Sequence, residues 1–161
     1  MSTHVGDSLP DDLFARLNGR GLAALADRVM AVCTVDEHGY PHPALLSYFE
    51  VVALDRRTLR LATYAESRTT SHAQRAGTLT LIFVEAEFVY YVKGAVRLLD
   101  ASMRATPFNA KLHVEVTDVL RDAPDPVREP GAAITTGIRY VNPRRAMDLE
   151  RAERVIAELR L

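Results

Sequence analysis

The sequence predicts a mainly β protein, a small antiparallel barrel with helical additions. Several short runs typical of β-strands follow one another, and loops short enough for hairpins join most of them. One helical pattern, Ser67–Ala76, interrupts this series, and a second closes the chain. A doubly wound parallel sheet would alternate strands and helices throughout, so it is disfavoured.

Composition limits the classes of protein to consider. The chain has 161 residues, 48% hydrophobic and 25% charged, with a formal net charge of -1, which indicates one globular domain over residues 1–161. That charge offers no general attraction to nucleic acid or to an anionic membrane. The sequence shows no membrane-spanning run and no secretory signal, and its single cysteine, Cys33, excludes an internal disulfide. We therefore expect a cytoplasmic protein that binds neither nucleic acid nor membrane.

The N-terminal region is expected to combine a loose tail with two short helices. Residues 1–9 have no periodic apolar pattern. From Pro10 apolar residues recur at helical spacing as far as Leu17, and Gly19 interrupts the pattern. A second short helix is predicted over residues 21–27.

Six strands are predicted next, over residues 29–35, 44–54, 58–63, 79–84, 88–99 and 111–120. The loop Asp36-Glu37-His38-Gly39 is typical of a hairpin, and Asp55-Arg56-Arg57 turns the second strand back into the third. The strand over 79–84 is apolar on both faces, which favours a central position. Gly94 inside the fifth strand indicates a bulge or a close backbone approach.

The C-terminal part is expected to add a further strand-like stretch and a helix. Residues 134–141 have the composition of a final strand. Asn142-Pro143 is a strong helix start, so a C-terminal helix is predicted over 143–161. Its apolar stripe contains Leu149, Ala152, Val155, Ile156 and Leu159.

The run Ser67-Arg68-Thr69-Thr70, between a predicted strand and a predicted helix, contains groups that can hold a phosphate. Free N–H groups at a helix start, hydroxyls and a guanidinium can all bind one anion. The same residues also fit an ordinary helix start, with Ser67 as the N-cap and Arg68 as a solvated side chain. The residues alone leave both interpretations open.

Several motifs occur in the order that a known family shows. Thr34–Pro41 is similar to its first hairpin, Leu59–Thr63 to the strand before its phosphate loop, and Tyr91–Leu98 to a later strand with a Gly-x-Ala/Val-x-x-Leu pattern. Ser67-Arg68 stands where that family has Ser-Arg-Lys. From Val32 to Leu99 the chain thus resembles the split-barrel proteins that bind flavin mononucleotide (FMN), such as pyridoxamine 5′-phosphate oxidase.

This resemblance implies a six-stranded antiparallel split β-barrel with an inserted helix and a C-terminal helix. It also implies a homodimer that holds FMN between its subunits and oxidises or reduces a small-molecule substrate. The implied cofactor-binding residues are His42, Ser47, Ala62, Thr63, Ser67, Arg68, Thr69 and Lys93. Thr69 departs from the family, where a lysine is common. The hydroxyls of Thr69 and Thr70, or Lys93 or Arg97 from a neighbouring strand, are expected to compensate.

Three features leave the activity open. The chain has no tryptophan, whereas the known oxidases carry one near their substrate-phosphate residues, so pyridoxamine phosphate is not the expected substrate. No residue is identified as a catalytic acid or base, and the histidines lack metal-site spacing. The alternatives are a flavin carrier without turnover and a relative that uses deazaflavin or haem. Cys33 is expected to be buried, and His72 to be a partly exposed helix residue.

Overall fold

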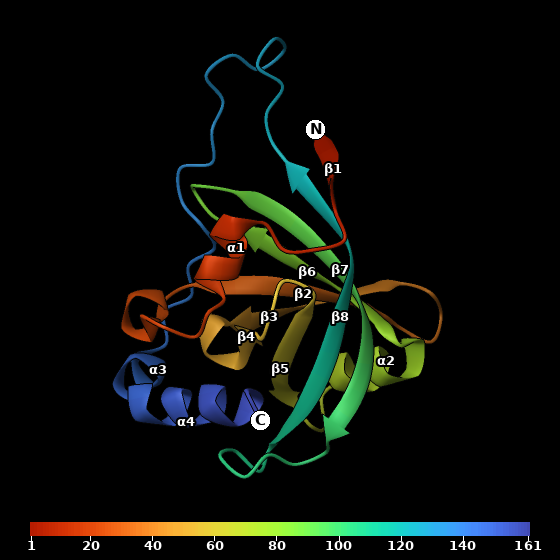
Figure 1. Ribbon diagram of the computed structural model, residues 1–161, viewed down its shortest axis with the longest axis vertical. Helices are drawn as coiled ribbons and strands as arrows, with labels where there is room; N and C mark the ends of the chain where they lie inside the picture. Colours follow the sequence, from red (N-terminus) through yellow and green to blue (C-terminus); the bar gives the residue numbers. More distant parts are fainter.

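The computed structural model describes residues 1–161, except for the side chain of Ala146. Its centre is one curled antiparallel sheet of eight strands in the order β3-β2-β6-β7-β8-β5-β4, with β1 paired to β8 (Figure 1). The strands are β1 (Ser2–Gly6), β2 (Val29–Val35), β3 (Pro41–Ser47), β4 (Val51–Ala53), β5 (Thr58–Tyr64), β6 (Thr78–Val84), β7 (Val89–Asp100) and β8 (Asn109–Asp122). The helices are α1 (Asp11–Arg16), α2 (Arg68–Ala76), α3 (Pro143–Met147) and α4 (Leu149–Leu159), with the 3₁₀ helices η1 (Leu22–Leu25) and η2 (Tyr48–Glu50). The predicted antiparallel barrel with an inserted helix is confirmed.

The N-terminal tail is ordered, so the expectation of a loose tail over residues 1–9 was wrong. β1 pairs with the distal part of β8, where Ser2 lies opposite Asp122. The reason lies in β8, whose pairing with β5 ends at Glu115 and leaves the rest of that edge open. Leu9 is buried, and its N–H donates to the carbonyl of Arg56 at 2.7 Å.

The predicted long strand over 44–54 is also wrong, because a turn divides it. Ser47 and Glu50 form a capping box: the Ser47 hydroxyl accepts from the N–H of Phe49, and the Glu50 carboxylate accepts from the N–H of Ser47. These local bonds favour the short helix η2 and leave β3 and β4 as separate strands. The split and the extra strand β1 account for eight strands where six were predicted.

The stretch over residues 134–141 makes only one isolated bridge, between Arg28 and Arg139, and so is not the predicted strand. Its backbone is held at two neighbouring points instead: Val29 N–H donates to Ile138 O, and Tyr140 N–H donates to Asp27 O. Residues 123–142 therefore form the loop that projects beyond the end of β8 and then return along the side of the barrel to α3 (Figure 1).

The central elements agree with the prediction. β6 lies between β2 and β7, and the hairpin of β2 and β3 places Val35 opposite Pro41. The register of β7 against β8 shifts between Lys93 and Gly94. A Cβ at Gly94 would collide with Val114 and with the backbone of Glu115, so the close approach expected for this glycine is present.

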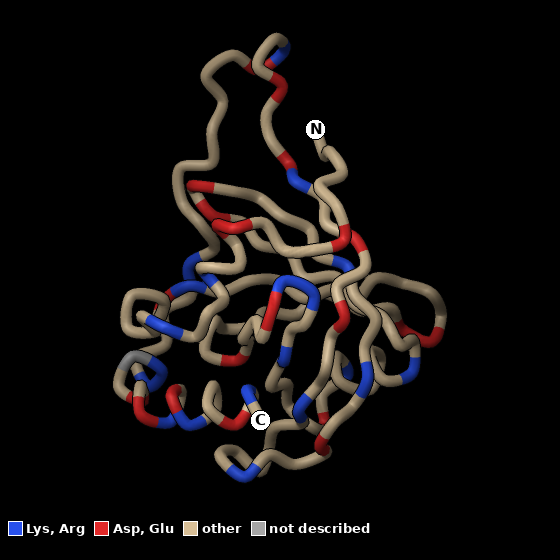
Figure 2. The backbone as a smooth tube through the Cα atoms, viewed as in Figure 1, with Lys and Arg blue, Asp and Glu red and all other residues tan. Residues whose placement is uncertain are grey.

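Acidic and basic residues are interspersed along the whole chain (Figure 2). This distribution fits the net charge of -1. No helix in the described part of the chain has the length and apolar character to span a membrane.

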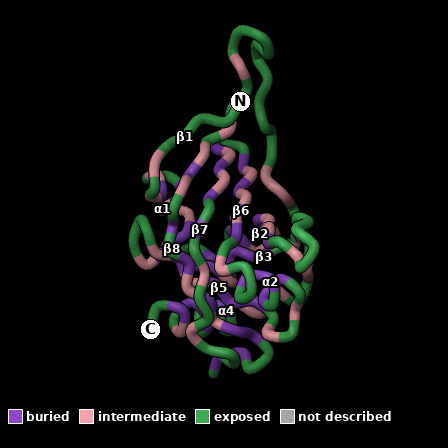
Figure 3. The backbone as a smooth tube through the Cα atoms, turned by 90° about the vertical axis from the view of Figure 1, so that its right-hand side faces the viewer, coloured by how far each residue is buried: buried purple, intermediate pink, exposed green. Residues whose placement is uncertain are grey.

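Two buried clusters hold the fold together. Figure 3 marks the buried positions along the chain in purple. The larger fills the barrel with side chains such as Leu59, Phe83 and Leu112. The smaller lies between the outer face of β4 and β5 and helix α4, and contains Ala62 and Ile156. The predicted apolar stripe is confirmed, but the C-terminal helix is broken at Asp148, whose carboxylate caps α4 by accepting from the N–H of Arg151.

A buried ionic cluster links four separate elements around Glu85, which is 1% exposed. Its carboxylate lies 2.7 Å from Arg28 and 3.3 Å from Arg16, and the hydroxyl of Tyr48 donates to it at 2.7 Å. Burial and the bond to Glu85 raise the pKa of Tyr48 far above its usual range, so this hydroxyl remains a donor. Gly137 packs so closely on the carboxylate that a Cβ there would overlap it. The cluster thus anchors the 134–141 segment to the barrel.

Candidate functional site

The junction of β5 and α2 is built from hydroxyl groups bonded to one another. The Ser67 hydroxyl caps α2 by accepting from the N–H of Thr70, and it donates to Tyr64 O at 2.8 Å. The Thr63 and Thr70 hydroxyls lie 2.7 Å apart, and Thr70 also reaches Tyr64 O. Both threonines are buried. These hydroxyls therefore fasten the helix to the strand.

The donors left open at this junction are those of Arg68 and Thr69. Neither residue's backbone N–H has a hydrogen-bond partner within the described structure, as is usual for the first turn of a helix. The Arg68 side chain is exposed and forms no ion pair with any described residue. One guanidinium and two N–H groups thus remain free to bind an anion beside the positive end of α2.

Two histidines lie against each other near this helix. His42 on β3 and His72 on α2 have ring centroids 4.9 Å apart in an edge-on arrangement. Nε2 of His72 is 3.6 Å from Glu37 in the β2–β3 hairpin, while its Nδ1 is buried without a partner. His72 is only 7% exposed, so the prediction of a partly exposed helix residue was wrong. The sequence around His72 does not predict this burial, because the covering residues come from β3 and the β2–β3 hairpin.

The remaining predicted cofactor residues are not gathered at this point. Ser47 is buried and caps η2. Ala62 is buried on the α4 side of β5, the face opposite to that of Thr63. Lys93 is paired with Asp118 at 2.8 Å, in a cluster that also includes His4 of β1. Its ammonium is therefore already engaged by a carboxylate.

Cys33, expected to be buried, is only half-buried. It lies between the buried Val32 and Thr34 in β2, and its side chain is on the opposite, less buried face of the strand. Its position gives no indication of a reactive site.

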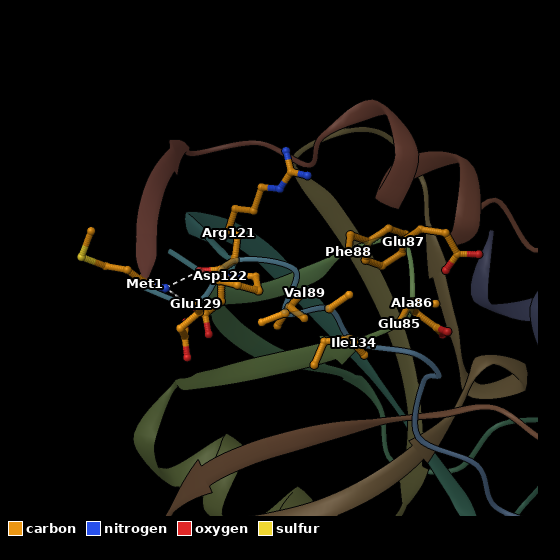
Figure 4. A pocket seen from close by; sticks show the side chains of 14 residues that line it. Met1, Glu85, Ala86, Glu87, Phe88, Val89, Arg121, Asp122, Glu129 and Ile134 are labelled. Atoms are coloured by element: carbon orange, nitrogen blue, oxygen red, sulfur yellow. Dashed lines mark hydrogen bonds and ion pairs between the residues drawn. The ribbon is translucent and has the colours of Figure 1, made fainter. Parts of the chain in front are cut away.

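Two hollows lie outside this junction. One, of about 370 Å³, is bounded by the β6–β7 hairpin, the end of β8 and the projecting loop (Figure 4). Its acidic groups are already bound: Asp122 accepts from Ser2 and Tyr91, and Glu85 belongs to the ionic cluster described above. The other is a groove of about 340 Å³ beneath α3 and α4, which shares Ser47 and Tyr64 with the strands of the predicted flavin site.

Comparison with known sequences gives two matches. A family model described as pyridoxamine 5′-phosphate oxidase matches residues 22–134. The uncharacterized protein YclD of Bacillus subtilis (strain 168) is 32% identical over 87 residues, which are 54% of this chain and 52% of YclD. The chain thus spans about half the length of this curated relative.

Solved structures share the architecture at low sequence identity. A candidate pyridoxamine 5′-phosphate oxidase from Lactobacillus delbrueckii superposes with a TM-score of 0.55 at 12% identity, covering 70% of this chain and 93% of that one. HupZ of Group A Streptococcus gives 0.54 at 15% identity, covering 69% and 91%. An FMN-binding protein from Syntrophomonas wolfei gives 0.51 at 13% identity, covering 69% and 88%. At these identities the likeness concerns the fold alone.

Proposed function

The chain belongs to the pyridoxamine 5′-phosphate oxidase family, and we propose that it binds FMN with the flavin phosphate at the start of helix α2. The observation that carries this proposal is the open donor set of Arg68 and Thr69. The guanidinium has no carboxylate partner among the described residues, and the two N–H groups beside it have no acceptor. A phosphate bound there would satisfy all three and would interact favourably with the helix dipole.

The donor set fits a phosphate, with one cation fewer than relatives that carry lysine after Ser-Arg. Thr69 is nearly buried and uncharged, and Lys93 is engaged by Asp118. The missing charged hydrogen bond is worth about 1–3 kcal/mol. We therefore expect this chain to hold FMN more weakly than a variant in which Thr69 is replaced by lysine.

The proposed activity is that of an oxidoreductase with a small-molecule substrate. Bound FMN would supply the electron transfer, and the protein would supply position, charge and shelter from water. His42 and His72 are the imidazoles at α2 that a proton transfer could use, and the Glu37 carboxylate lies 3.6 Å from Nε2 of His72. The pair is thus the best placed to serve a reaction in which protons accompany electrons.

A homodimer is proposed to complete the site, since exposed apolar side chains lie on and before β3, a strand that packs against α2. Leu45 on β3, the end strand of the sheet path, is 53% exposed, and Tyr40 before that strand is 69% exposed. A second subunit would cover such residues. Light scattering on the purified protein measures this directly, and a monomeric mass in the presence of saturating FMN would contradict it.

The test compares FMN with riboflavin, which has the same ring but no phosphate. Quenching of flavin fluorescence gives both affinities. Arg68→Ala is expected to weaken FMN binding about tenfold to a hundredfold, the equivalent of a lost charged hydrogen bond, and to leave riboflavin binding unchanged. Arg75→Ala is the matched control, because Arg75 lies at the other end of α2 and donates to Val35 O.

Two results would contradict the phosphate assignment: equal affinity for FMN and riboflavin in the unmodified protein, or an equal loss for both flavins in Arg68→Ala. A protein that binds no flavin would contradict the whole proposal. Flavin binding without reduction by nicotinamide nucleotides, and without reoxidation by any acceptor, would identify a carrier instead of an enzyme.

A further inference from the structure

The groove beneath α3 and α4 contains buried polar groups that no protein group satisfies. Thr106 and Asn109, in and just after the β7–β8 loop, are each 4% exposed. Both line the groove, and neither Oγ1 of Thr106 nor Oδ1 of Asn109 has a hydrogen-bond partner. Leaving such a group unpaired costs about 1–3 kcal/mol, so two of them converging on one groove call for an explanation.

Cationic groups gather at the same groove. Nη1 of Arg145 is buried without a hydrogen-bond partner, while its guanidinium lies 5.3 Å from the ring of Tyr140. Arg144 lines the groove and forms no ion pair within the part of the chain that the structure describes. Arg151 also lines it but is engaged by Asp148 at 2.8 Å. Arg144 and Arg145 thus form no ion pair among the described residues, although the charge of Arg145 acts on the buried Glu50 carboxylate that also lines the groove.

The groove is also lined by an aromatic pair. Tyr64 at the end of β5 and Phe108 before β8 have ring centroids 5.9 Å apart. Their exposed fractions are 63% and 53%, unusually high for two large side chains that contact each other. A flat ring can stack on this pair while its polar substituents face Thr106 and Asn109.

From this combination we propose that the groove is a binding site for a small planar aromatic or heteroaromatic acid. The acid group binds at Arg144 and Arg145, and a hydroxyl or ring N–H donates to Oδ1 of Asn109. A volume of about 340 Å³ is at the small end of ligand pockets and suits one or two rings. The proposal goes beyond the flavin site and does not depend on it, because none of Thr106, Asn109, Arg144 and Arg145 is among the residues that would hold the flavin phosphate.

Salicylate is a suitable probe, because it is planar and carries both a carboxylate and a hydroxyl. Calorimetric titration of the full chain, with and without FMN, is expected to show one saturable site per chain in both cases. Salicylamide, its uncharged analogue, is expected to bind at least about tenfold more weakly, because charge-assisted hydrogen bonds are the stronger ones.

Two kinds of variant assign that binding to the groove. Thr106→Val and Asn109→Leu are each expected to weaken salicylate binding about fivefold or more without lowering the melting temperature, since each removes an unpaired polar group. Arg145→Met is expected to abolish the preference for salicylate over salicylamide. Arg154→Met is its matched control, because Arg154 is on α4 and paired with Glu150 outside the groove.

Three results would overturn the proposal: no saturable binding, equal binding of the two probes, or unchanged affinity in Thr106→Val. Competition between salicylate and FMN would also overturn it, because the groove would then belong to the flavin site. Loss of FMN binding in Arg68→Ala leaves the expected salicylate affinity unchanged, so the two proposals fail separately.

Discussion

Tyr64, at the end of β5, contacts two regions that differ in how their buried polar side chains are bonded: the start of α2 and the groove beneath α3 and α4. Its carbonyl accepts from the hydroxyls of Ser67 and Thr70 at the start of α2, where the buried hydroxyls are bonded. Its ring contacts Phe108 at the groove, where the buried polar atoms of Thr106 and Asn109 have no partner.

This difference distinguishes polar groups that stabilise the fold from polar groups that can bind a ligand. Bonded hydroxyls at the junction hold helix to strand, so they offer little to a ligand; the groups left open there are the Arg68 guanidinium and two N–H groups. In the groove, the side-chain oxygens of Thr106 and Asn109 have no hydrogen-bond partner. Buried polar groups in proteins are nearly always paired, and the two unpaired ones that line the groove are therefore the basis of the ligand proposal made there.

The largest expected effect comes from the buried ionic cluster around Glu85. Glu85→Ala removes the carboxylate that Arg16, Arg28 and Tyr48 share, and leaves two guanidinium groups in a largely buried place without a counter-charge. We expect a loss of about 3–5 kcal/mol in the free energy of unfolding, measured by urea denaturation. Glu87→Ala is the control, because the side chain of Glu87 is 57% exposed. Equal losses in the two variants would mean that the cluster has no special role in stability.

A smaller effect is expected at the β5–α2 junction. Thr70→Val leaves the Thr63 hydroxyl without its partner and removes the donor to Tyr64 O, so we expect a loss of about 1–3 kcal/mol. The double variant with Thr63→Val is expected to lose less than the sum of the two single variants, because each single change already breaks the shared bond. Strict additivity in urea denaturation would contradict the pairing.

The parts of the fold that the sequence predicts are those set by short-range signals. The hairpin loop at Asp36–Gly39, the apolar β6, the bulge at Gly94 and the stripe of α4 all follow from local patterns. β1 was missed because it depends on a distant open edge of β8. The division at Ser47 was missed because a capping box overrode a strand-like composition.

The sequence predicts the site where one segment carries it, as at Ser67-Arg68. It does not predict the groove, because Thr106, Asn109 and Arg145 come from segments that meet only after folding, and a lone threonine or asparagine in a loop is ordinary. The opposite orientation of Ala62 and Thr63 follows from the predicted strand itself, because successive strand residues face opposite sides of a sheet. What the sequence does not show is that Ala62 packs in the cluster beneath α4.

The smallest expected effect is a change of stability with pH, and it tests whether Glu50 at the groove is desolvated. Burial raises the pKa of Glu50 at the groove above its ordinary 4.5, an effect opposed by the Ser47 N–H and by Arg145. The folded protein then binds this proton more tightly than the unfolded chain, so the Glu50 contribution to stability falls as pH rises through and above 4.5. Glu50→Gln cannot ionise, and its stability relative to the unmodified protein is expected to rise over that window.

For Asp118 on β8, the expected change of stability with pH has the opposite sign. The hydrogen bond from Lys93 lowers the pKa of Asp118 below its ordinary 3.8, so its stabilising contribution is present above that pH and is lost as pH falls below it. Asp118→Asn is therefore expected to flatten the acid side of the stability curve, whereas Glu50→Gln changes the side toward neutral pH. Urea denaturation at a series of pH values measures both. Parallel curves for Glu50→Gln and the unmodified protein would show that the groove does not hold Glu50 in a desolvated place, which would weaken the contrast between the groove and the start of α2.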